Sequence, residues 1–409
     1  MILLPALYVE KYDISVAVIG IVIFLAKIID IISDPIMGLI CDKSFFSRKL
    51  LMFFGAIISG TSIYFLFFPF IFPDPLYLGI MITFLYTGWT IFQVPYLSFG
   101  YDLESDYQKR TRLSGTRELF ILLGLSTSVS LPFVLNDEYS TETILTYLAI
   151  YSGILSLAVF FFYVEEPKRK KNTNNLKLLS SISKNLVFLR LILSWFINSL
   201  ANVFPMILFI FFVTYVLGAD EPTREKILFF YFFSAVIGMP FWISVNKFID
   251  KHLVWSISMF LSSIFFSFVF FLDFGDIIYF IIISCLTGFC LGADLAIPPS
   301  MQSDVIDYQK LEFKQDISGI FFSLLTFINK IAFGLASLIS FSLLDSFGFE
   351  PNEKLTQRTE ILLFILYAGI PIFLKLLSAY IIISYPLSKQ KTEKITKKLL
   401  GEKKKYYTK

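Results

Sequence analysis

Charged residues are scarce in this 409-residue sequence, at 16% of the total, whereas soluble proteins carry about 25%. The chain has one histidine, His252, which we expect in a basic loop, and three cysteines. These are too few for a histidine-based metal site or a disulfide framework. Walker A, HExxH and strand-linked GxGxxG motifs are also missing. The sequence therefore excludes a cytosolic enzyme, a disordered protein and a secreted disulfide-rich scaffold.

Hydrophobic residues are abundant instead, at 56% of the chain, with 49 phenylalanines. They fall in blocks of about 20 residues, the length of helix that crosses a hydrocarbon core of about 30 Å. Uninterrupted apolar blocks cannot be the alternating strands of a barrel. The predicted fold class is therefore an all-α integral membrane protein. Eleven complete spans are expected, at residues 15–41, 50–72, 77–100, 113–135, 143–164, 186–217, 227–246, 253–272, 277–297, 318–345 and 360–385.

A short apolar segment at residues 1–9 precedes the first complete span. Nine residues are too few to cross a bilayer as a helix. The basic region and small-residue cleavage site of a signal peptide are absent. We expect this segment to be the second half of a truncated first span, so that the restored fold would have twelve spans.

Lysine and arginine are distributed unequally between the two sets of loops. The set that includes residues 42–49, the linker at 165–185 and the tail after 388 holds 27 of the 35, and the opposite set holds five. Because basic loops stay in the cytoplasm, we predict a protein of the cytoplasmic (plasma) membrane whose C-terminus is cytoplasmic.

The basic linker divides the chain into two similar halves. We predict an N-terminal helix bundle at residues 1–164 with its first span incomplete, a cytoplasmic linker at 165–185, a C-terminal helix bundle at 186–387 and a basic cytoplasmic tail at 388–409. With the first span restored, each bundle has six helices, the arrangement of transporters built from two rocking halves.

Three ionisable residues, Lys27, Asp30 and Asp34, lie in the first complete span at spacings that place them on one helical stripe. Each costs about 2.5–3.5 kcal/mol at a helix centre. Two carboxylates one turn apart repel unless a proton or a cation joins them, and hard cations such as Na⁺ prefer oxygen ligands. We predict a cation site at Asp30 and Asp34. The alternative, a Lys27–Asp30 ion pair that joins two helices, leaves Asp34 unexplained.

Two further lysines lie inside predicted spans. Lys330 is about a dozen residues into its span, too deep to reach water comfortably, and needs a carboxylate partner. Asp30 and Asp34 are candidates. Lys375 has no motif around it, and a structural or snorkelling role is expected there.

Asp294 and Trp89 are also placed inside predicted spans. Asp294 precedes Pro298-Pro299, where we expect a break or kink, and it fits a cavity carboxylate or a helix-end cap equally well. Trp89 could stack a sugar or pack against lipid. The segment 101–118 alternates acids and bases, which suggests a salt-bridged latch between helix ends that breaks when the bundles rock.

Several motifs carry a family resemblance. Asp30, Asp34, Pro35 and Gly38 within residues 26–38 match a known signature, and four further matches are Val94-Pro95-Tyr96, residues 106–111 with Arg117-Glu118, residues 304–308 and Asn329-Lys330. Together they resemble the glycoside–pentoside–hexuronide:cation symporters, a melibiose-permease-like branch of the major facilitator superfamily. The resemblance implies a major facilitator fold of two six-helix bundles and alternating access driven by a gradient of Na⁺, H⁺ or Li⁺.

The resemblance also implies roles for single residues. The residues that match Asp30, Asp34, Thr90 and Lys330 form or adjoin the family's cation site, and the arginine that matches Arg117 lies at its substrate cavity. Three departures are visible. Gln93 stands where the melibiose-permease-like branch has an acid that serves both cation and sugar, Leu97 replaces a sugar-stacking tryptophan, and Lys109 replaces a loop glutamate. The first leaves the ion identity open, and the second weakens a galactoside interpretation.

We therefore expect a transporter, not an enzyme, that couples Na⁺ or H⁺ to the entry of a sugar, glycoside or uronide. It would act as a monomer in the lipid bilayer, without a cofactor, a nucleic-acid partner or a metal other than the coupling ion. The alternatives are a lysophospholipid transporter of the same fold, and a membrane enzyme or receptor. The predicted sites are a cation site of Asp30, Asp34, Thr90, Gln93 and Lys330, a substrate cavity of Lys27, Trp89, Arg117 and Asp294, and a cytoplasmic gate of Asp106, Arg110 and Arg112.

Overall fold

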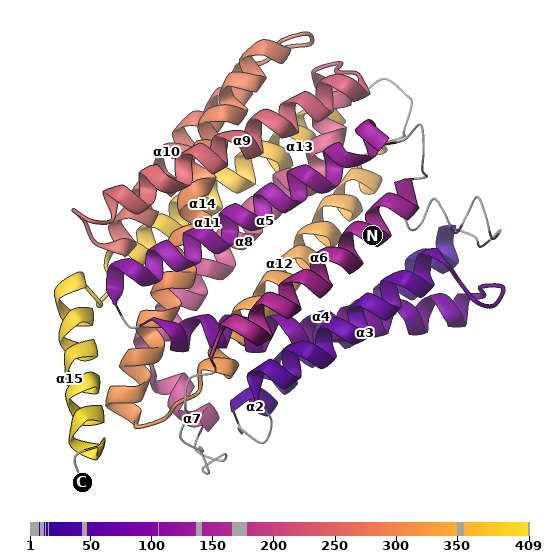
Figure 1. The fold of residues 1–409 in the computed structure, drawn as a ribbon. Helices are drawn as coiled ribbons and strands as arrows, with labels where there is room; N and C mark the ends of the chain where they lie inside the picture. Colours follow the sequence, from indigo (N-terminus) through magenta and orange to yellow (C-terminus); the bar gives the residue numbers. More distant parts are fainter. Residues whose placement is uncertain are drawn as a thin grey trace. The chain divides into compact units, whose positions relative to one another are not determined.

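The computed structural model describes residues 16–42, 47–104, 106–135, 141–165, 178–349 and 356–407, together with 8, 12 and 14. Every regular element in these ranges is a helix (Figure 1). The all-α prediction is therefore confirmed. Apart from residue 8, the predicted half-span at 1–9 lies outside the described residues.

The helices up to residue 163 are α2 (Val16–Asp42), α3 (Arg48–Phe67), α4 (Pro75–Leu103), α5 (Tyr107–Leu135) and α6 (Thr141–Tyr163). The later helices are α7 (Leu178–Lys184), α8 (Leu186–Phe211), α9 (Glu221–Val245), α10 (Lys251–Ser267), α11 (Ile277–Phe313), α12 (Ser318–Ser346), α13 (Gln357–Phe364), α14 (Ile370–Ile383) and α15 (Lys389–Tyr407). Three short segments continue helices with a different winding: η1 (Phe212–Val216), η2 (Phe268–Phe271) and η3 (Ile365–Gly369).

Within the described ranges, nine helical segments are long and apolar enough to cross a membrane. The other two predicted spans coincide with α2 and α5, which have 27 and 29 residues. The lengths match the bilayer because each residue of a helix rises 1.5 Å.

Backbone packing divides the chain into two compact units. Unit 1 consists of Met1–Leu103, Gly124–Asn175 and Asp316–Phe327, and unit 2 consists of Glu104–Leu123, Leu176–Gln315 and Ile328–Lys409. The first part of α5 therefore packs in unit 2, and the first part of α12 packs in unit 1.

Helices α3 and α4 of unit 1 approach at the level of their backbones. A Cβ atom at Gly88 would lie 2.7 Å from the amide nitrogen of Ser59. Lipid tails supply no hydrophobic force between helices, so small residues that permit close approach stabilise the contact. Helix α4 also packs against α2.

Helix α11 is central to unit 2, where it packs against α9 and α10, while α14 packs against α8 and α10 (Figure 1). Gly238 of α9 and Gly292 of α11 allow the first of these contacts. A Cβ atom at Gly292 would lie 2.5 Å from the amide nitrogen of Met239. Elsewhere in unit 2, Phe212 of η1 stacks on Tyr367 of η3, with ring centroids 4.2 Å apart.

Of the break or kink expected at Pro298-Pro299, the break is wrong, because α11 continues through both prolines and has 37 residues. Proline is tolerated in a membrane helix where neighbouring helices hold the backbone, and Ile297 and Met301 on either side are buried in unit 2. His252 lies in the first turn of α10 and is buried, so its assignment to a loop is also wrong.

The segment 101–118 is mostly helix rather than loop. Helix α4 continues to Leu103 and α5 begins at Tyr107. The carboxylate of Asp106 accepts hydrogen bonds from the backbone N–H groups of Gln108 and Lys109, at 3.0 and 2.9 Å. This is the geometry of a helix N-cap. The alternation of acids and bases had suggested a salt-bridged latch instead.

We predict that Gly292→Ala destabilises the protein, because the added methyl group would meet backbone atoms of α9 that cannot move aside. Overpacking of this kind costs about 1–3 kcal/mol in free energy of unfolding. The measurement is thermal unfolding of the detergent-solubilised full chain. The matched control is Gly334→Ala, where a Cβ atom has no neighbour within 4 Å. Equal stability of the two variants would contradict the close α9–α11 contact described above.

Candidate functional site

Two buried carboxylates, Asp30 and Asp34, form the acidic centre of unit 1. Their exposed fractions are 2% and 1%. The hydroxyl of Thr90 on α4 lies 2.9 Å from Oδ1 of Asp34 and 3.3 Å from Oδ1 of Asp30. One hydroxyl hydrogen can serve only one carboxylate at a time, so Thr90 lies within reach of both acids and donates to one of them.

Lys27 adds one positive charge to this centre. Its Nζ lies 2.8 Å from Oδ2 of Asp30 and 4.5 Å from the centre of the Tyr86 ring. The ion pair predicted as an alternative is therefore formed, but within α2 rather than between two helices. Asp34 is not part of that pair, and the charges of Lys27, Asp30 and Asp34 sum to minus one when all three are ionised.

The other two residues of the predicted cation site are Gln93 and Lys330. Gln93 is one turn beyond Thr90 on α4 and half-buried, and its side chain hydrogen-bonds to no other residue that the structure describes. Lys330 belongs to the part of α12 that packs in unit 2. The structure thus brings Lys27, Asp30, Asp34 and Thr90 together.

Asp294 is the centre of a second polar network, in unit 2. Its Oδ1 accepts a hydrogen bond from Nε1 of Trp255 at 2.7 Å. Its Oδ2 accepts hydrogen bonds from Nδ2 of Asn202 at 3.2 Å and from Nζ of Lys375 at 2.8 Å. Asp294 lies in the middle of α11 and is 5% exposed, so it does not cap a helix end.

Lys375 on α14 is a residue whose role sequence reasoning missed. It forms an ion pair with Asp294, and its Nζ also lies 3.3 Å from Oδ1 of Asn198 on α8. The sequence did indicate that Lys375 needs a partner from another helix. Lys375 lies inside the last predicted span, and no acid lies within one helical turn of it. The sequence separation of 81 residues hid which acid is that partner.

The remaining residues of the predicted cavity are Arg117 and Trp89. Arg117 of α5 pairs with the adjacent Glu118, at 2.5 Å. Trp89 of α4 is 52% exposed, and its ring lies 5.9 Å from that of Phe92. Of the four predicted residues, Lys27 and Trp89 belong to unit 1, and Arg117 and Asp294 belong to unit 2.

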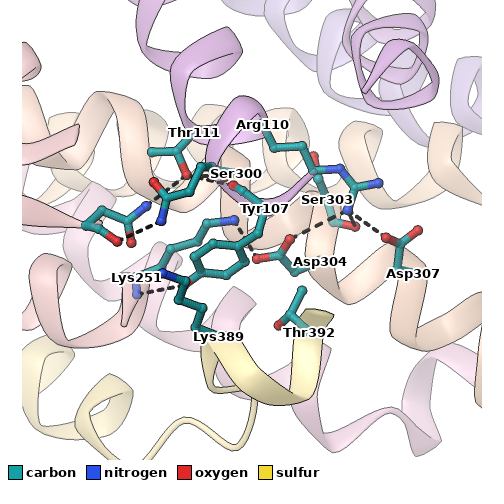
Figure 2. Close-up of polar contacts among 12 residues, drawn as sticks. Tyr107, Arg110, Thr111, Lys251, Ser300, Ser303, Asp304, Asp307, Lys389 and Thr392 are labelled. Carbon is teal, nitrogen blue, oxygen red and sulfur yellow. Dashed lines mark hydrogen bonds and ion pairs between the residues drawn. The ribbon is translucent and has the colours of Figure 1, made fainter. Parts of the chain in front are cut away.

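A charged cluster joins α5, α10 and α11 within unit 2 (Figure 2). Arg110 lies 2.6 Å from a carboxylate oxygen of Asp307 and 3.6 Å from one of Asp304. Lys251 lies 2.7 Å from the other oxygen of Asp304, and its Nζ is 3.7 Å from the centre of the Tyr107 ring. All four charged side chains are at most 6% exposed, so each depends on its partner.

Neutral hydrogen bonds extend this cluster to α9. Thr111 of α5 shares a hydrogen bond of 3.0 Å with Ser300 of α11, and the amide of Asn246 donates to Thr111 at 3.1 Å. Figure 2 shows Thr111 and Ser300 beside the ion pairs. Among the predicted gate residues, only Arg110 belongs to the cluster. Asp106 caps α5, and Arg112 is exposed.

A comparable arrangement in unit 1 was also missed. Asp42, at the end of α2, accepts hydrogen bonds from the N–H groups of Gly319 and Ile320 in the first turn of α12, at 2.7 and 2.8 Å. Arg48 donates to the hydroxyl of Ser318 at 2.7 Å and forms an ion pair with Asp102. Sequence reasoning had counted Arg48 as a loop charge.

Membrane-length helices that bury charges in pairs are typical of membrane transporters. The family model for MFS/sugar transport proteins matches residues 1–389. The chain therefore belongs to this family, which is one of transporters rather than enzymes, and it is an integral membrane protein. The predicted major facilitator fold is confirmed.

Two curated relatives are symporters. The uncharacterized symporter YnaJ of Bacillus subtilis (strain 168) is 23% identical over 98% of this chain and 90% of its own length. The sodium-dependent lysophosphatidylcholine symporter 1-A of Danio rerio is 26% identical over 61% of this chain. The match spans about half, 49%, of that fish protein.

Solved structures share the fold at low sequence identity. The fucose:proton symporter of E. coli aligns with a TM-score of 0.67 and 12% identity, over 94% of both chains. A bacterial homologue of the iron transporter ferroportin, in an outward-facing state, aligns with a TM-score of 0.69 and 14% identity, also over 94% of both chains.

We predict that Arg110→Met strongly destabilises the protein, because Asp307 and Asp304 would lose a buried positive charge. Removing one member of a buried ion pair costs about 3–5 kcal/mol in free energy of unfolding. Arg112→Met is the matched control, since Arg112 lies on the same helix and is exposed. Thermal unfolding in detergent compares the two, and similar melting temperatures would contradict the assigned role of Arg110.

Proposed function

We propose that this protein is a cation-coupled symporter that carries a sugar, glycoside or uronide across the cytoplasmic membrane by alternating access. The coupling ion is Na⁺ or H⁺, and it binds at Asp30 and Asp34. The observation that carries this proposal is the contact of one hydroxyl, that of Thr90, with two buried carboxylates inside a membrane span.

The chemistry of the acidic centre favours a monovalent cation. Lys27 compensates one carboxylate, and a single Na⁺ or proton compensates the second, so that the occupied centre carries no net charge. Carboxylate and hydroxyl oxygens are the ligands that hard cations prefer. Lys330 is proposed to compete with the cation when the centre is empty.

Cation binding would then be coupled to substrate binding. If the cation removes repulsion between α2 carboxylates, it also stabilises the conformation of α2 and α4 that accepts substrate. Such coupling is reciprocal, so substrate raises the affinity for the cation by the same factor. The cluster around Arg110 is proposed to break and re-form as the cytoplasmic side opens and closes.

A second candidate substrate is a lysophospholipid. The relative from Danio rerio is named a sodium-dependent lysophosphatidylcholine symporter, and the match covers 61% of this chain. The 49 phenylalanines also suit an amphipathic solute. This candidate keeps the fold and the cation site and changes only the cargo.

We predict that Asp34→Asn reduces gradient-driven uptake to the level of vesicles without the protein, because the neutral amide neither supplies the negative charge that balances a cation nor takes up a proton. Uptake is measured in proteoliposomes under an imposed Na⁺ gradient and, separately, an imposed H⁺ gradient. The gradient that drives wild-type uptake identifies the coupling ion.

Asp220→Asn is the matched control for this variant. Asp220 is exposed before α9, and hydrogen bonds from the side chain and backbone of Thr223 hold the pKa of its carboxyl below its usual value. It is thus an ionised carboxylate outside the spans, and asparagine keeps its capping ability. The cation assignment fails if Asp34→Asn retains gradient-driven uptake.

We predict that the substrate classes separate in a competition panel. Excess nitrophenyl glycosides and glucuronides should inhibit uptake if the cargo is a sugar derivative, and lysophosphatidylcholine should inhibit it if the cargo is a lysophospholipid. The panel uses submicellar lysolipid, with an acyl-matched neutral detergent as the control for membrane damage. Inhibition by the detergent alone would reject the lysolipid result.

A further inference from the structure

The network around Asp294 draws polar side chains from several helices into the interior of unit 2. Asp294 itself accepts hydrogen bonds from Trp255, Asn202 and Lys375. Beside it, Oδ1 of Asn329 accepts hydrogen bonds from Nε1 of Trp195 at 2.8 Å and from the hydroxyl of Ser199 at 2.7 Å. Residues 195, 198, 199 and 202 recur at helical spacing, so α8 presents them on one face.

The orientation of each amide in this network is fixed by a partner with only one possible role. Lys375 can only donate, so the atom of Asn198 that faces it is the oxygen. An ionised Asp294 can only accept, so the atom of Asn202 that faces it is the nitrogen. The indole of Trp195 can only donate, so it faces the oxygen of Asn329.

These orientations leave the network with more donors than acceptors. The ammonium of Lys375 directs two of its three hydrogens at Asp294 and Asn198. Its third hydrogen, and the amide hydrogens of Asn198 and Asn329, have no acceptor among the residues that the structure describes. Lys375 is 13% exposed, so this surplus is accessible.

We propose that this network is the subsite for a negatively charged group on the substrate, a carboxylate or a phosphate, with Lys375 as its principal ligand. The inference rests on the proposed function and narrows its cargo to molecules that carry a carboxylate or a phosphate. Carboxylate and phosphate oxygens accept the surplus hydrogens, and charge-assisted bonds to an ammonium are the strong ones. A cation does not suit this subsite, because the only charges of the network, on Asp294 and Lys375, already cancel.

The surroundings of Lys375 also suit the rest of such a molecule. The ring of Trp195 is half-buried and lies 6.1 Å from the buried ring of Trp255, which fixes its position. A sugar ring or the glycerol end of a lysolipid can pack on an aromatic surface of this kind. If the Lys375–Asp294 ion pair had only a structural role, it would need neither the surplus N–H donors nor the half-buried ring of Trp195 beside it.

The test is equilibrium binding to the detergent-solubilised full chain, with no ion gradient. Two matched pairs of probes separate the sources of the anion: nitrophenyl glucuronide against nitrophenyl glucoside, and lysophosphatidylcholine against the monoacylglycerol of the same chain length. We expect the anionic or phosphate-bearing member of one pair to bind about tenfold more tightly than its neutral partner. Lys375→Gln should remove that preference, and Lys375→Arg should retain part of it.

The exposed Lys226→Gln is the matched control and should keep the preference. Because Lys375→Gln leaves Asp294 without its positive partner, the double variant Asp294→Asn with Lys375→Gln provides a neutral pair whose folding is checked by its melting temperature. No preference for either anionic probe in the wild type, or a preference that survives in Lys375→Gln and the double variant, would overturn the inference. Failure of the proposed function is distinguishable, because it appears as gradient-independent uptake and not in this binding assay.

Discussion

The constraint on which this structure depends is that a charge inside a membrane span needs a partner. Insertion scales and simulations both make an isolated ion in hydrocarbon costly. In the described helices, buried charged side chains form ion pairs. Most pairs connect different helices, so they fix which helices are neighbours as well as cancelling charge. The pairs Lys27–Asp30 and Arg117–Glu118 lie within α2 and α5. The pairs that connect helices are Arg48–Asp102, Arg110–Asp307, Lys251–Asp304 and Lys375–Asp294.

How much of the structure can be predicted from the sequence depends on how far apart the interacting residues are along the chain. Hydropathy identified the helices, because the length of an apolar block is a local property, and the spacing of Lys27, Asp30 and Asp34 placed them on one stripe for the same reason. The partners of Arg110 and Lys375 lie 197 and 81 residues away, and no local pattern specifies them. The prolines of α11 predicted a break that is absent, because neighbouring helices, which local sequence reasoning does not identify, pack around the helix and keep it continuous.

The two polar centres differ in the polar groups that they bring together, and this difference is more informative than their charges. At Asp30 and Asp34, one hydroxyl lies within reach of two carboxylates, and the proposed cation site rests on that arrangement. Around Lys375, amide and ammonium hydrogens outnumber the oxygens, and the proposed anion subsite rests on that surplus. A buried N–H group without an acceptor is costly, so a ligand that brings acceptor oxygens to Lys375 would lower that cost.

These two proposed sites have a consequence for the energetics of the proposed transport cycle. One elementary charge that crosses the membrane exchanges about 2.3 kcal/mol with each 100 mV of potential. A monovalent cation that travels with a carboxylate monoanion moves no net charge, so the cycle would draw on the ion's concentration gradient alone. With zwitterionic lysophosphatidylcholine, the same cation would carry one net positive charge, and the membrane potential would add to the driving force. The charge of the cargo at Lys375 thus determines whether the cation at Asp34 is driven by concentration or also by voltage.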